Sequence, residues 1–293
     1  MDIVDAQIHM GPGEIDATLQ AMDALGIRSL IIDELWQMRP SGHPTHLQPG
    51  YRLANGAWRT AAPVAVQASL AHPERFSFLV RIDPLDPELE SVMRVVGSTP
   101  GARAFRLQPV WTPADAAAFA AGSYEALFDL AQHIGLPVCV FIPGYVELLE
   151  LYLKKYPKVK MVIDHCGLGF SFLPPVRPRS EHDFAASPAY FSRVLALAQY
   201  PNLALKWSHA QDRFGVQTYP YEGLRPYLRQ AIAAFGAHRV IWASDKTVIP
   251  GHGWPNLLNY LRDDPELSQD EKEWVLGGSA RKIFNWPALE NAS

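Results

Sequence analysis

Eight short apolar runs, each followed by a longer segment, recur along the chain, and this repetition limits the folds that it can adopt. The runs are rich in Val, Ile, Leu and Phe without strict alternation, which is typical of parallel strands buried on both faces. They cover residues 3–9, 29–33, 76–82, 102–107, 137–142, 160–164, 203–207 and 239–243. Apolar residues at helical spacing follow in 15–25, 124–133, 145–156, 190–199 and 221–235.

Repeated strand–helix units require a parallel sheet, and eight of them fit a closed barrel. We predict an α/β fold in which residues 1–293 form a single (β/α)8 TIM barrel domain, a size that such barrels commonly reach. An open, doubly wound sheet is the main alternative. Gly11-Pro12-Gly13 follows the first run, but its spacing differs from that of the glycine-rich turn that binds dinucleotides. The sequence therefore favours the barrel.

Three predicted connections are too long for simple turns. They are residues 34–59 after the second strand, 166–187 after the sixth and 208–220 after the seventh. All three follow the carboxyl end of a strand, which is the face on which barrels of this kind carry their active sites. Their Pro, Gly, His and aromatic residues indicate ordered lids or pocket walls.

Composition argues against several functions. Lys and Arg number 26 and Asp and Glu number 30, so the formal net charge of -4 gives no support for nucleic-acid binding. Two cysteines without a Cys-x-x-Cys pair argue against a disulfide scaffold and a thiolate zinc site, and favour a reducing compartment. We expect no signal peptide, and no apolar run of the sequence is long enough to span a bilayer. We expect a cytoplasmic protein without a membrane partner, with a homodimer as the commonest assembly.

The polar residues that end the predicted strands are the candidates for chemistry, because the carboxyl ends of barrel strands meet at one mouth. Imidazole, carboxylate, guanidinium and ammonium groups are costly to bury on apolar strands unless they are paired or used. Because the candidates all lie at the ends of predicted strands, they favour a reaction centre built chiefly from His9, His165 and Asp245. The full set is Gln7, His9, Arg81, Arg106, His165, Lys206, Ser208 and Asp245.

Each candidate also has a structural interpretation. A single His at a strand end is more often a hydrogen-bonded structural residue, and Asp245 could cap the next turn or pair with Lys246. Arg106 and Lys206 could be partners in structural ion pairs. Cys166 is expected to be a small buried hydrophobe rather than a nucleophile. We expect the loop histidines at the surface or in pocket walls; these are His43, His46, His209 and His252.

Several segments, taken in order, resemble the amidohydrolase superfamily, in particular the amidohydrolase 2 group that contains lactone hydrolases and decarboxylases. The resemblance covers nearly the whole chain and implies a hydrolase-like barrel. The similar segments are Val4-Asp5-Ala6-Gln7-Ile8-His9, 101–109, 136–144, Val162-Ile163-Asp164-His165-Cys166-Gly167, Arg239-Val240-Ile241-Trp242-Ala243-Ser244-Asp245 and 276–284.

Departures from the family's metal-binding pattern bear on the cofactor. Metal-dependent members carry His-x-His on the first strand, where this chain has Gln7 before His9, and another His after the fifth strand, where 140–142 offers none. Of the usual four ligands His9 and Asp245 remain, and His165 matches a His that more often activates water or substrate. A catalytic zinc site needs three protein ligands and an open position. We therefore predict no cofactor and no metal. The alternative is a divalent metal such as zinc on His9, His165 and Asp245, aided by Gln7.

The chain is most similar to the lactonase branch, which implies a hydrolase of a small cyclic ester (lactone) or a similarly activated cyclic carbonyl compound. Asp245 is expected to accept a proton from the attacking water as general base. His9 and His165 are expected to polarise the carbonyl, with Gln7 as a neutral donor. The side chains predicted to bind a small-molecule substrate that carries an anionic group are Arg81, Arg106, Lys206, Trp36, Phe141, Trp207 and Trp254.

Two other classes of function remain. One is a metal-dependent hydrolase or nonoxidative decarboxylase with a substituted ligand. The other is a barrel that binds a small molecule without catalysis. Retention of His9, His165 and Asp245 together argues against the second class, because a protein that only binds has no need for a base.

Overall fold

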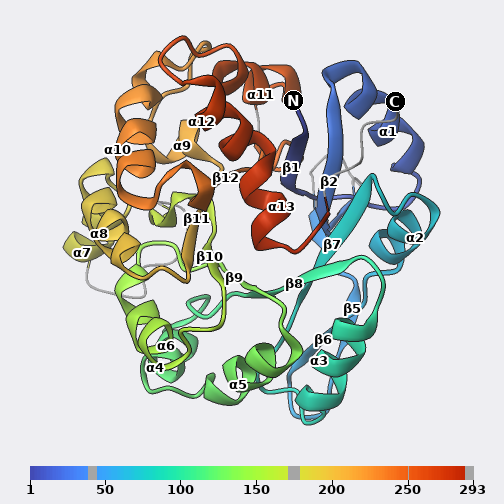
Figure 1. Ribbon diagram of the computed structural model, residues 1–293. Coiled ribbons are helices and arrows are strands. Elements are labelled where there is room, and N and C mark those ends of the chain that lie inside the picture. The colour runs from blue at the N-terminus through green and yellow to red at the C-terminus, as the bar shows by residue number, and fades with distance from the viewer. Residues whose placement is uncertain (39–44, 171–178, 250, 288–293) are drawn as a thin grey trace.

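The computed structural model describes residues 1–38, 45–170, 179–249 and 251–287. Eight parallel strands form one sheet in chain order, which curls into a nearly closed barrel surrounded by helices (Figure 1). Each strand overlaps one of the eight predicted runs, so the predicted barrel fold is confirmed. The strands are β1 (Ile3–Ile8), β2 (Ile27–Asp33), β7 (Phe76–Arg81), β8 (Ala102–Leu107), β9 (Val138–Val140), β10 (Met161–Ile163), β11 (Leu203–Trp207) and β12 (Val240–Trp242).

Successive residues of each strand point alternately to the helices and to the barrel axis, and their sizes differ accordingly. Phe76, Phe78 and Trp242 are large and belong to the core between the strands and the helices. The cluster at the axis uses smaller side chains, because eight strands leave little room there. Its strand members are Val4, Ala6, Ile31, Leu79, Ala104, Cys139, Val162, Ala204 and Ile241, and Ala243, just after β12, joins them.

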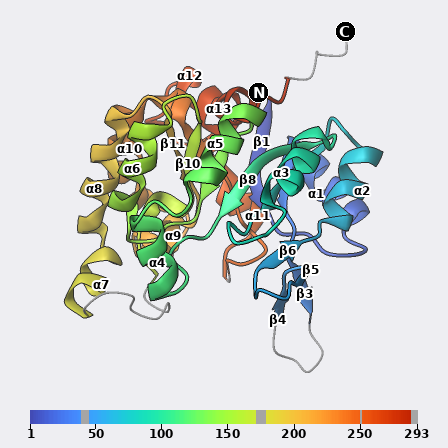
Figure 2. The same cartoon turned by 90° about the horizontal axis from the view of Figure 1, so that it is seen from below.

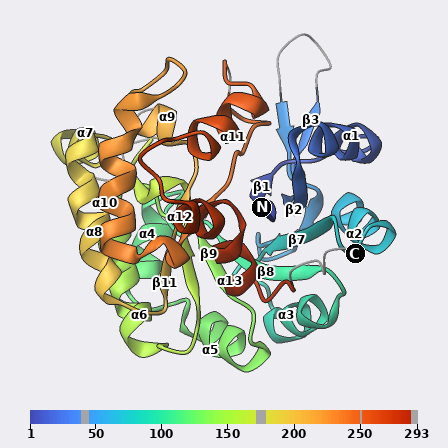
Figure 3. The same cartoon turned by 45° about the horizontal axis from the view of Figure 1, so that its top comes forward.

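The C-terminal segment closes the end of the barrel at which the strands begin. Figure 1 and Figure 3 show α13 (Ser279–Ile283) lying over the strands near the centre of the molecule. Gly277 permits this close approach, because a Cβ at that position would lie 1.8 Å from the main-chain oxygen of Asp2. The long connections that follow the strands therefore lie at the opposite end of the barrel. The C-terminal residues that join the axial cluster are Ala280, Ile283, Phe284 and Trp286.

Helices and short helical turns cover the outside of the barrel. All five predicted helical segments contain helix. Among the described residues, no helix combines the length and the apolar character that crossing a bilayer requires. The helices are α1 (Ile15–Leu25), α2 (Pro63–Ala71), α3 (Leu89–Ser98), α4 (Pro113–Ala120), α5 (Glu125–Ile134), α6 (Glu150–Lys155), α7 (Arg179–Ala185), α8 (Phe191–Ala196), α9 (Ala210–Arg213), α10 (Arg225–Phe235), α11 (Trp254–Arg262), α12 (Gln269–Glu273) and α13. The helical turns are η1 (Val146–Leu149), η2 (His165–Gly167), η3 (Pro188–Tyr190), η4 (Leu197–Gln199), η5 (Glu222–Leu224), η6 (Ala237–Arg239) and η7 (Trp274–Gly278).

The long connection after β2 contains two antiparallel hairpins. β3 (Trp36–Met38) pairs with β4 (Thr45–Leu47), and β5 (Gly50–Arg52) pairs with β6 (Trp58–Thr60). Figure 2 shows both hairpins projecting at the end of the barrel opposite α13. They extend the barrel wall around the mouth. Residues 39–44 of this connection, and residues 171–178 of the one after β10, lie outside the described residues.

The buried side chain of Asp5 fastens the seam between the first and the last strand. Its Oδ1 accepts a hydrogen bond from the main-chain nitrogen of Ser244 at 2.9 Å, and its Oδ2 accepts one from Trp254 Nε1 at 2.8 Å. The main-chain nitrogen of Asp245 donates to the carbonyl oxygen of Gln7 at 2.9 Å. These bonds hold the chain after β12 against β1 and fix the position of Asp245.

Burial raises the pKa of the Asp5 carboxyl to about 6, although its hydrogen bonds act in the opposite direction. Because this pKa lies above the unfolded value, the proton on Asp5 stabilises the folded chain at low pH, and that contribution is lost as the pH rises through 6. An asparagine at this position stays neutral at every pH. We therefore predict that Asp5→Asn destabilises the protein by about 2 kcal/mol more at pH 4.5 than at pH 7. Urea unfolding of both proteins at the two pH values measures this difference, and an equal cost at both would contradict the raised pKa.

Candidate active site

Asp245 lies three residues beyond the end of β12, at the carboxyl end of the barrel, and three imidazoles meet its buried carboxylate. His9 Nε2 lies 3.2 Å from Oδ1. His209 Nε2 lies 2.9 Å from Oδ2, and His165 Nε2 lies 3.7 Å from the same oxygen. The structure thus brings together the three residues predicted as the reaction centre, and it adds His209, for which the sequence predicted only a surface or pocket-wall position.

Three of these four residues adopt a backbone conformation that is unusual for side chains other than glycine. The φ angles are 53° for His165, 54° for His209 and 47° for Asp245, all in the left-handed region. Such angles cost energy and persist where the surroundings enforce them, which is often at functional sites. Each residue lies just beyond the end of its strand, where this turn of the backbone directs the side chain toward the neighbouring strand ends.

The second ring nitrogen of each imidazole, Nδ1, also lies near an oxygen, at hydrogen-bond distance in His9 and His165 and at ion-pair distance in His209. In His9 this is the main-chain oxygen of Asp33, which can only accept, so Nδ1 donates. Neutral His9 therefore presents the lone pair of Nε2 to Asp245. The Nδ1 distances are 2.7 Å from His9 to Asp33 O, 2.7 Å from His165 to Ser208 Oγ and 3.5 Å from His209 to Asp212 Oδ2.

Burial and neighbouring charges set different protonation states in the cluster. Burial lowers the pKa of His9 and lowers that of His165 well below its usual value, so both rings are neutral near pH 7. Burial also lowers the pKa of His209, but its hydrogen bonds with Asp212 and Asp245 outweigh this and raise it. For Asp245, burial acts to raise the pKa of the carboxyl. The neighbouring His9 and His209 outweigh burial and lower this pKa below its usual value, so the carboxylate is ionised.

A chain of buried ion pairs, here called the ion-pair belt, lies beside the histidines and consists of Asp33, Arg81, Arg106, Asp164 and Lys206. Asp33 accepts two hydrogen bonds from Arg81, of 2.7 and 3.0 Å, and also pairs with Arg106. Arg106 Nε donates to Asp164 Oδ2 at 2.8 Å, and Lys206 Nζ lies 2.6 Å from Asp164 Oδ1. The belt therefore links β2, β7, β8 and β11 with the residue that follows β10.

The belt corrects the substrate-binding role predicted for Lys206. Its side chain is fully buried, and its Nζ is shared between Asp164 and Gln7 Oε1, which lies 2.8 Å away. Lys206 is thus a structural ion-pair partner rather than a substrate anchor. Gln7 in turn donates from Nε2 to Asp245 Oδ2 at 3.4 Å, so its amide connects the belt to the reaction centre.

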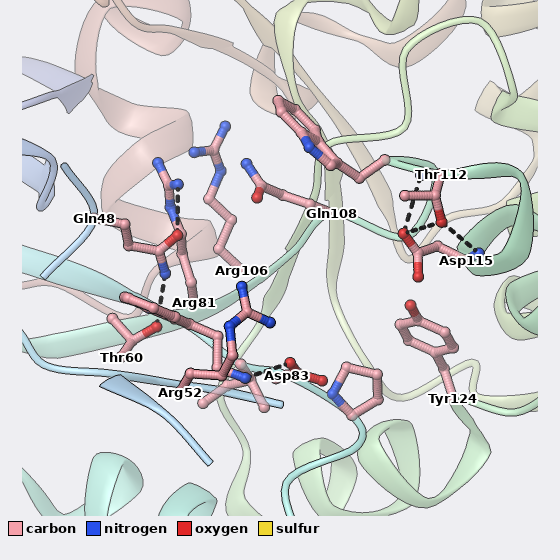
Figure 4. A pocket seen from close by; sticks show the side chains of 14 residues that line it. Gln48, Arg52, Thr60, Arg81, Asp83, Arg106, Gln108, Thr112, Asp115 and Tyr124 are labelled. Atoms are coloured by element: carbon pink, nitrogen blue, oxygen red, sulfur yellow. Dashed lines mark hydrogen bonds between the residues drawn. The ribbon is translucent and has the colours of Figure 1, made fainter. Parts of the chain in front are cut away.

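Arg81 and Arg106 belong to the belt and also line a cavity of about 400 Å³. The guanidinium of Arg52 donates to the main-chain oxygen of Gly56 at 2.8 Å and forms no ion pair within the part of the chain that the structure describes. Trp58 and Trp111 add aromatic surface to the lining. Figure 4 shows one side of the cavity formed by Gln48, Arg52, Arg81 and Arg106, and the other by Thr112, Asp115 and Tyr124.

Two of the predicted aromatic residues lie at or near the mouth. The ring centroid of Phe141 is 5.4 Å from that of His165, and the guanidinium of Arg106 lies 5.6 Å from the same phenyl ring. Phe141 therefore forms an apolar wall beside the reaction centre. Trp36, in the hairpin after β2, is half-buried and donates from Nε1 to Glu34 at 2.7 Å.

The other two predicted aromatic residues lie away from the mouth. Trp207 is fully buried, stacks on Phe214 with 5.7 Å between ring centroids and donates to the Tyr260 hydroxyl at 2.8 Å. It faces the helices because Lys206, the residue before it on β11, faces the axis. Trp254 is bonded to Asp5 at the seam. Neither contacts the reaction centre.

The remaining sequence candidates outside the mouth keep structural roles. Cys166 is buried, and burial raises the pKa of its thiol to about 12, which leaves it protonated and unreactive. His252 is hydrogen-bonded to the Tyr221 hydroxyl at 2.8 Å. His43 lies outside the described residues, as does the side chain of His46.

Sequence reasoning missed three residues of this site. Asp33 ends the second predicted strand, so the rule that selects strand ends would have included it. His209 lies two residues beyond β11, and the sequence carries no signal for the left-handed turn that brings it back to Asp245. Asp212 contacts the site only through His209 and could not be found without it.

A model of the amidohydrolase family matches residues 4–286, which is nearly the whole chain. The chain belongs to the amidohydrolase family. It is therefore an enzyme of that superfamily, and the cluster around Asp245 lies at the strand ends, where this fold places active sites.

Individual relatives are more distant. L-fucono-1,5-lactonase of Burkholderia ambifaria is 30% identical over 151 residues, which are 48% of this chain and 47% of that protein, so the match spans about half the length of this curated relative. A zinc-bound amidohydrolase of Burkholderia multivorans has a TM-score of 0.70 at 17% identity over 98% of this chain and all of that one. A protein proposed to be a 2-pyrone-4,6-dicarboxylic acid hydrolase of Pseudomonas putida has a TM-score of 0.65 at 18% identity over 99% of both chains. At these identities the two structures show a common fold.

The positions that hold a metal in metal-dependent members do not fit one here. Gln7 stands in place of the first imidazole, and its amide oxygen is engaged by Lys206. Phe141 follows β9, where those members carry a histidine. Of the usual set His9 and Asp245 remain, and two protein ligands are fewer than zinc normally takes.

We predict that Lys206→Met lowers the free energy of unfolding by about 3 kcal/mol, because it leaves Asp164 buried with Arg106 as its remaining charged partner. Lys154→Met is the matched control, since Lys154 is exposed and solvent screens its pairing with Glu150, so we expect almost no loss of stability. Urea unfolding followed by tryptophan fluorescence measures both variants. Equally small losses would show that the belt is unimportant for stability.

Proposed function

We propose that the protein hydrolyses a small cyclic ester or a similarly activated cyclic carbonyl compound. The observation that carries this proposal is the Oδ1 atom of Asp245. It belongs to a buried, ionised carboxylate and accepts no hydrogen bond within the described residues. Such an oxygen can take a proton from a water molecule, which is the role of a general base in hydrolysis.

The relatives support the class of bond. L-Fucono-1,5-lactone is a cyclic ester of a sugar acid, and a 2-pyrone is an unsaturated cyclic ester. Because one match covers half a chain and the other is a likeness of fold, they support ester hydrolysis rather than either individual substrate.

In the proposed reaction, Asp245 accepts a proton from water as the water oxygen bonds to the ester carbonyl carbon. The carbonyl oxygen gains negative charge, the ring carbon–oxygen bond then breaks, and the departing alkoxide takes up the proton to give a hydroxy acid. Water that is not bound to a metal is a very weak acid, so the substrate carbonyl must be activated and its oxyanion stabilised. No step of this proposal uses a metal ion.

Arg106 is a better candidate for polarising the carbonyl than His9 or His165, to which the sequence assigned this role. The two histidines are neutral, and Nε2 of His9 carries a lone pair rather than a proton. Arg106 is permanently charged, its Nη2 lies 3.5 Å from His165 Nε2, and it also lines the cavity. It can therefore donate to an oxyanion formed beside Asp245.

The cavity beside the belt suits the non-reacting part of a polar substrate. Arg52 can bind a carboxylate through two parallel hydrogen bonds. Trp58 and Trp111 supply apolar faces, and Asp83 supplies an acceptor for hydroxyl groups. We therefore expect a small ring that carries hydroxyl groups or a carboxylate, with Arg52 in place of Lys206 as the anchor.

We predict that Asp245→Asn lowers kcat/KM at least about 100-fold, because an amide cannot accept the proton. The substrate is the best of a panel of aldonolactones, 2-pyrones and aromatic carboxylic acids. Ring opening is followed as acid release in weak buffer. Asp263→Asn, which changes an exposed aspartate, is the control and is expected to keep full activity.

Turnover of the Asp245 variant within a few-fold of wild type, with an unchanged circular dichroism spectrum, would exclude Asp245 as the base. Release of carbon dioxide from an aromatic acid, without opening of any lactone, would favour the decarboxylase alternative.

A further inference from the structure

We propose that a cavity at the amino end of the barrel binds a small organic carboxylate whose apolar body is about the size of a benzene ring. The cavity has a volume of about 160 Å³ and lies where β10 and β11 begin, beside η6 and α13. This end is opposite the reaction centre, and the proposal does not rest on the hydrolysis proposed above.

Buried apolar side chains form the floor of this cavity. Met161 and Leu203 are the first residues of β10 and β11, and both belong to the core between the strands and the helices. Ile283 of α13 belongs to the axial cluster. Such a floor favours contact with an apolar group over contact with water. A dry apolar cavity of about 150 Å³ can hold benzene, so this one has room for a ring or a branched chain of that size.

The rim of the cavity is positively charged. Its exposed residues are Lys160, His238 and Lys282, with Arg239 half-buried beside them. No Asp or Glu is among the described residues that line the cavity. Partial burial and the charge of Lys282 lower the pKa of Lys160. Partial burial, Lys282 and Arg239 likewise lower the pKa of His238. The cations thus repel one another, and a bound anion would relieve that repulsion.

Two of these cations have protons to donate to a ligand. Lys160 Nζ donates to the main-chain oxygen of Lys282 at 3.1 Å and to Asn285 Oδ1 at 3.2 Å. Of its three ammonium protons, one is therefore left over within the described residues. Lys282 Nζ lies 5.6 Å from the centre of the Trp274 ring and forms no ion pair with a described residue. Because Lys160 is bonded to the main chain of Lys282, the two residues lie side by side, and one carboxylate can accept from both.

Arg239 adds a fixed positive charge to the rim. Its guanidinium donates four hydrogen bonds of 2.8 to 3.1 Å to the main-chain oxygens of Ala198, Tyr200, Leu203 and Phe235. These neutral acceptors hold the side chain in place without cancelling its charge. Arg239 therefore contributes to the potential that attracts an anion, while Lys160 and Lys282 supply the hydrogen bonds.

The combination of floor and rim selects a carboxylate with an apolar body over a bare inorganic anion. Phosphate has polar oxygens on every side, and those turned to Met161 and Leu203 would lose their hydrogen bonds to water. A carboxylate attached to a ring turns its two oxygens to the ammonium groups and its apolar side to the floor. One small molecule of this kind matches both surfaces of the cavity.

The test uses sodium benzoate as the probe and the full chain as the protein. Isothermal titration calorimetry measures the Kd, and competitive acetylation of the lysines, read by mass spectrometry, locates the site. At a benzoate concentration about ten times the Kd, acetylation of Lys160 and Lys282 is expected to slow about tenfold, because a bound carboxylate covers their amines. Lys154, which is exposed and does not line the cavity, is expected to keep its rate.

Three variants separate this site from other sources of binding. Lys282→Glu is expected to weaken benzoate binding at least about tenfold, because it replaces an attraction with a repulsion. Lys154→Glu makes the same change of net charge elsewhere and is the matched control, expected to bind as wild type does. Arg52→Gln removes the anchor at the mouth, and protection of Lys160 is expected to persist in it. Circular dichroism establishes that each variant is folded, and acetylation of wild type decides the proposal if Lys282→Glu does not fold.

Two further ligands test the chemistry of recognition. Benzamide has the shape of benzoate without its charge and is expected to give no protection. Inorganic phosphate is expected to bind at least about tenfold more weakly than benzoate, because it has no apolar body. Equal protection by benzamide, equally tight binding of phosphate, or loss of Lys160 protection in Arg52→Gln would each overturn the proposal, as would absence of protection in wild type.

Discussion

The pairing of buried charges in the ion-pair belt is the constraint on which the rest of this barrel depends. Asp33 and Asp164 are at most 1% exposed, and a carboxylate buried to this extent costs several kcal/mol unless it is paired. Arg106 contacts both of them at once. Because these acids belong to different strand ends on either side of β8, a shift of register in the strands between would break one of the two pairs. The belt therefore favours one register of the barrel over its alternatives.

The same charges set the electrostatics of the reaction centre. The main-chain oxygen of Asp33 fixes which nitrogen of His9 carries its proton, and Arg106 lies beside His165, where its positive charge helps to keep that ring neutral. Positive neighbours also stabilise the ionised form of Asp245. Two neutral imidazoles and a carboxylate with an unused lone pair are thus a consequence of how the interior charges are paired.

The strands were predictable because they are buried on both faces, which gives each one a continuous apolar run. The hairpins after β2 were not, since strands of three residues in a polar connection have no such pattern. His9, His165 and Asp245 could be placed at one mouth because barrel topology brings strand ends together. Lys206 and Trp207 could not both face that mouth, because adjacent residues of a strand point in opposite directions. The two residues are consecutive in the sequence, so this could be inferred without the structure.

His209 shows the limit of prediction from strand ends. Its approach to Asp245 depends on a φ angle of 54°, which is rare enough outside glycine that no sequence pattern indicates it. The turned backbone lets the His209 ring bond to Asp245, which is 36 residues away in the sequence. Residues recruited in this way become visible only once the fold is known.

Gln7 and His209 can be understood as two parts of one arrangement. A metal-bound imidazole at position 7 would have only an N–H to present, and Lys206, which lies there with an ammonium group, can only donate. Glutamine resolves this conflict, because its oxygen accepts from Lys206 while its nitrogen donates to Asp245. Gln7, on the first strand, is thereby hydrogen-bonded to the ion-pair belt through Lys206. Gln7 and His209 therefore both bond to Oδ2 of Asp245, and Oδ1 is left as the acceptor.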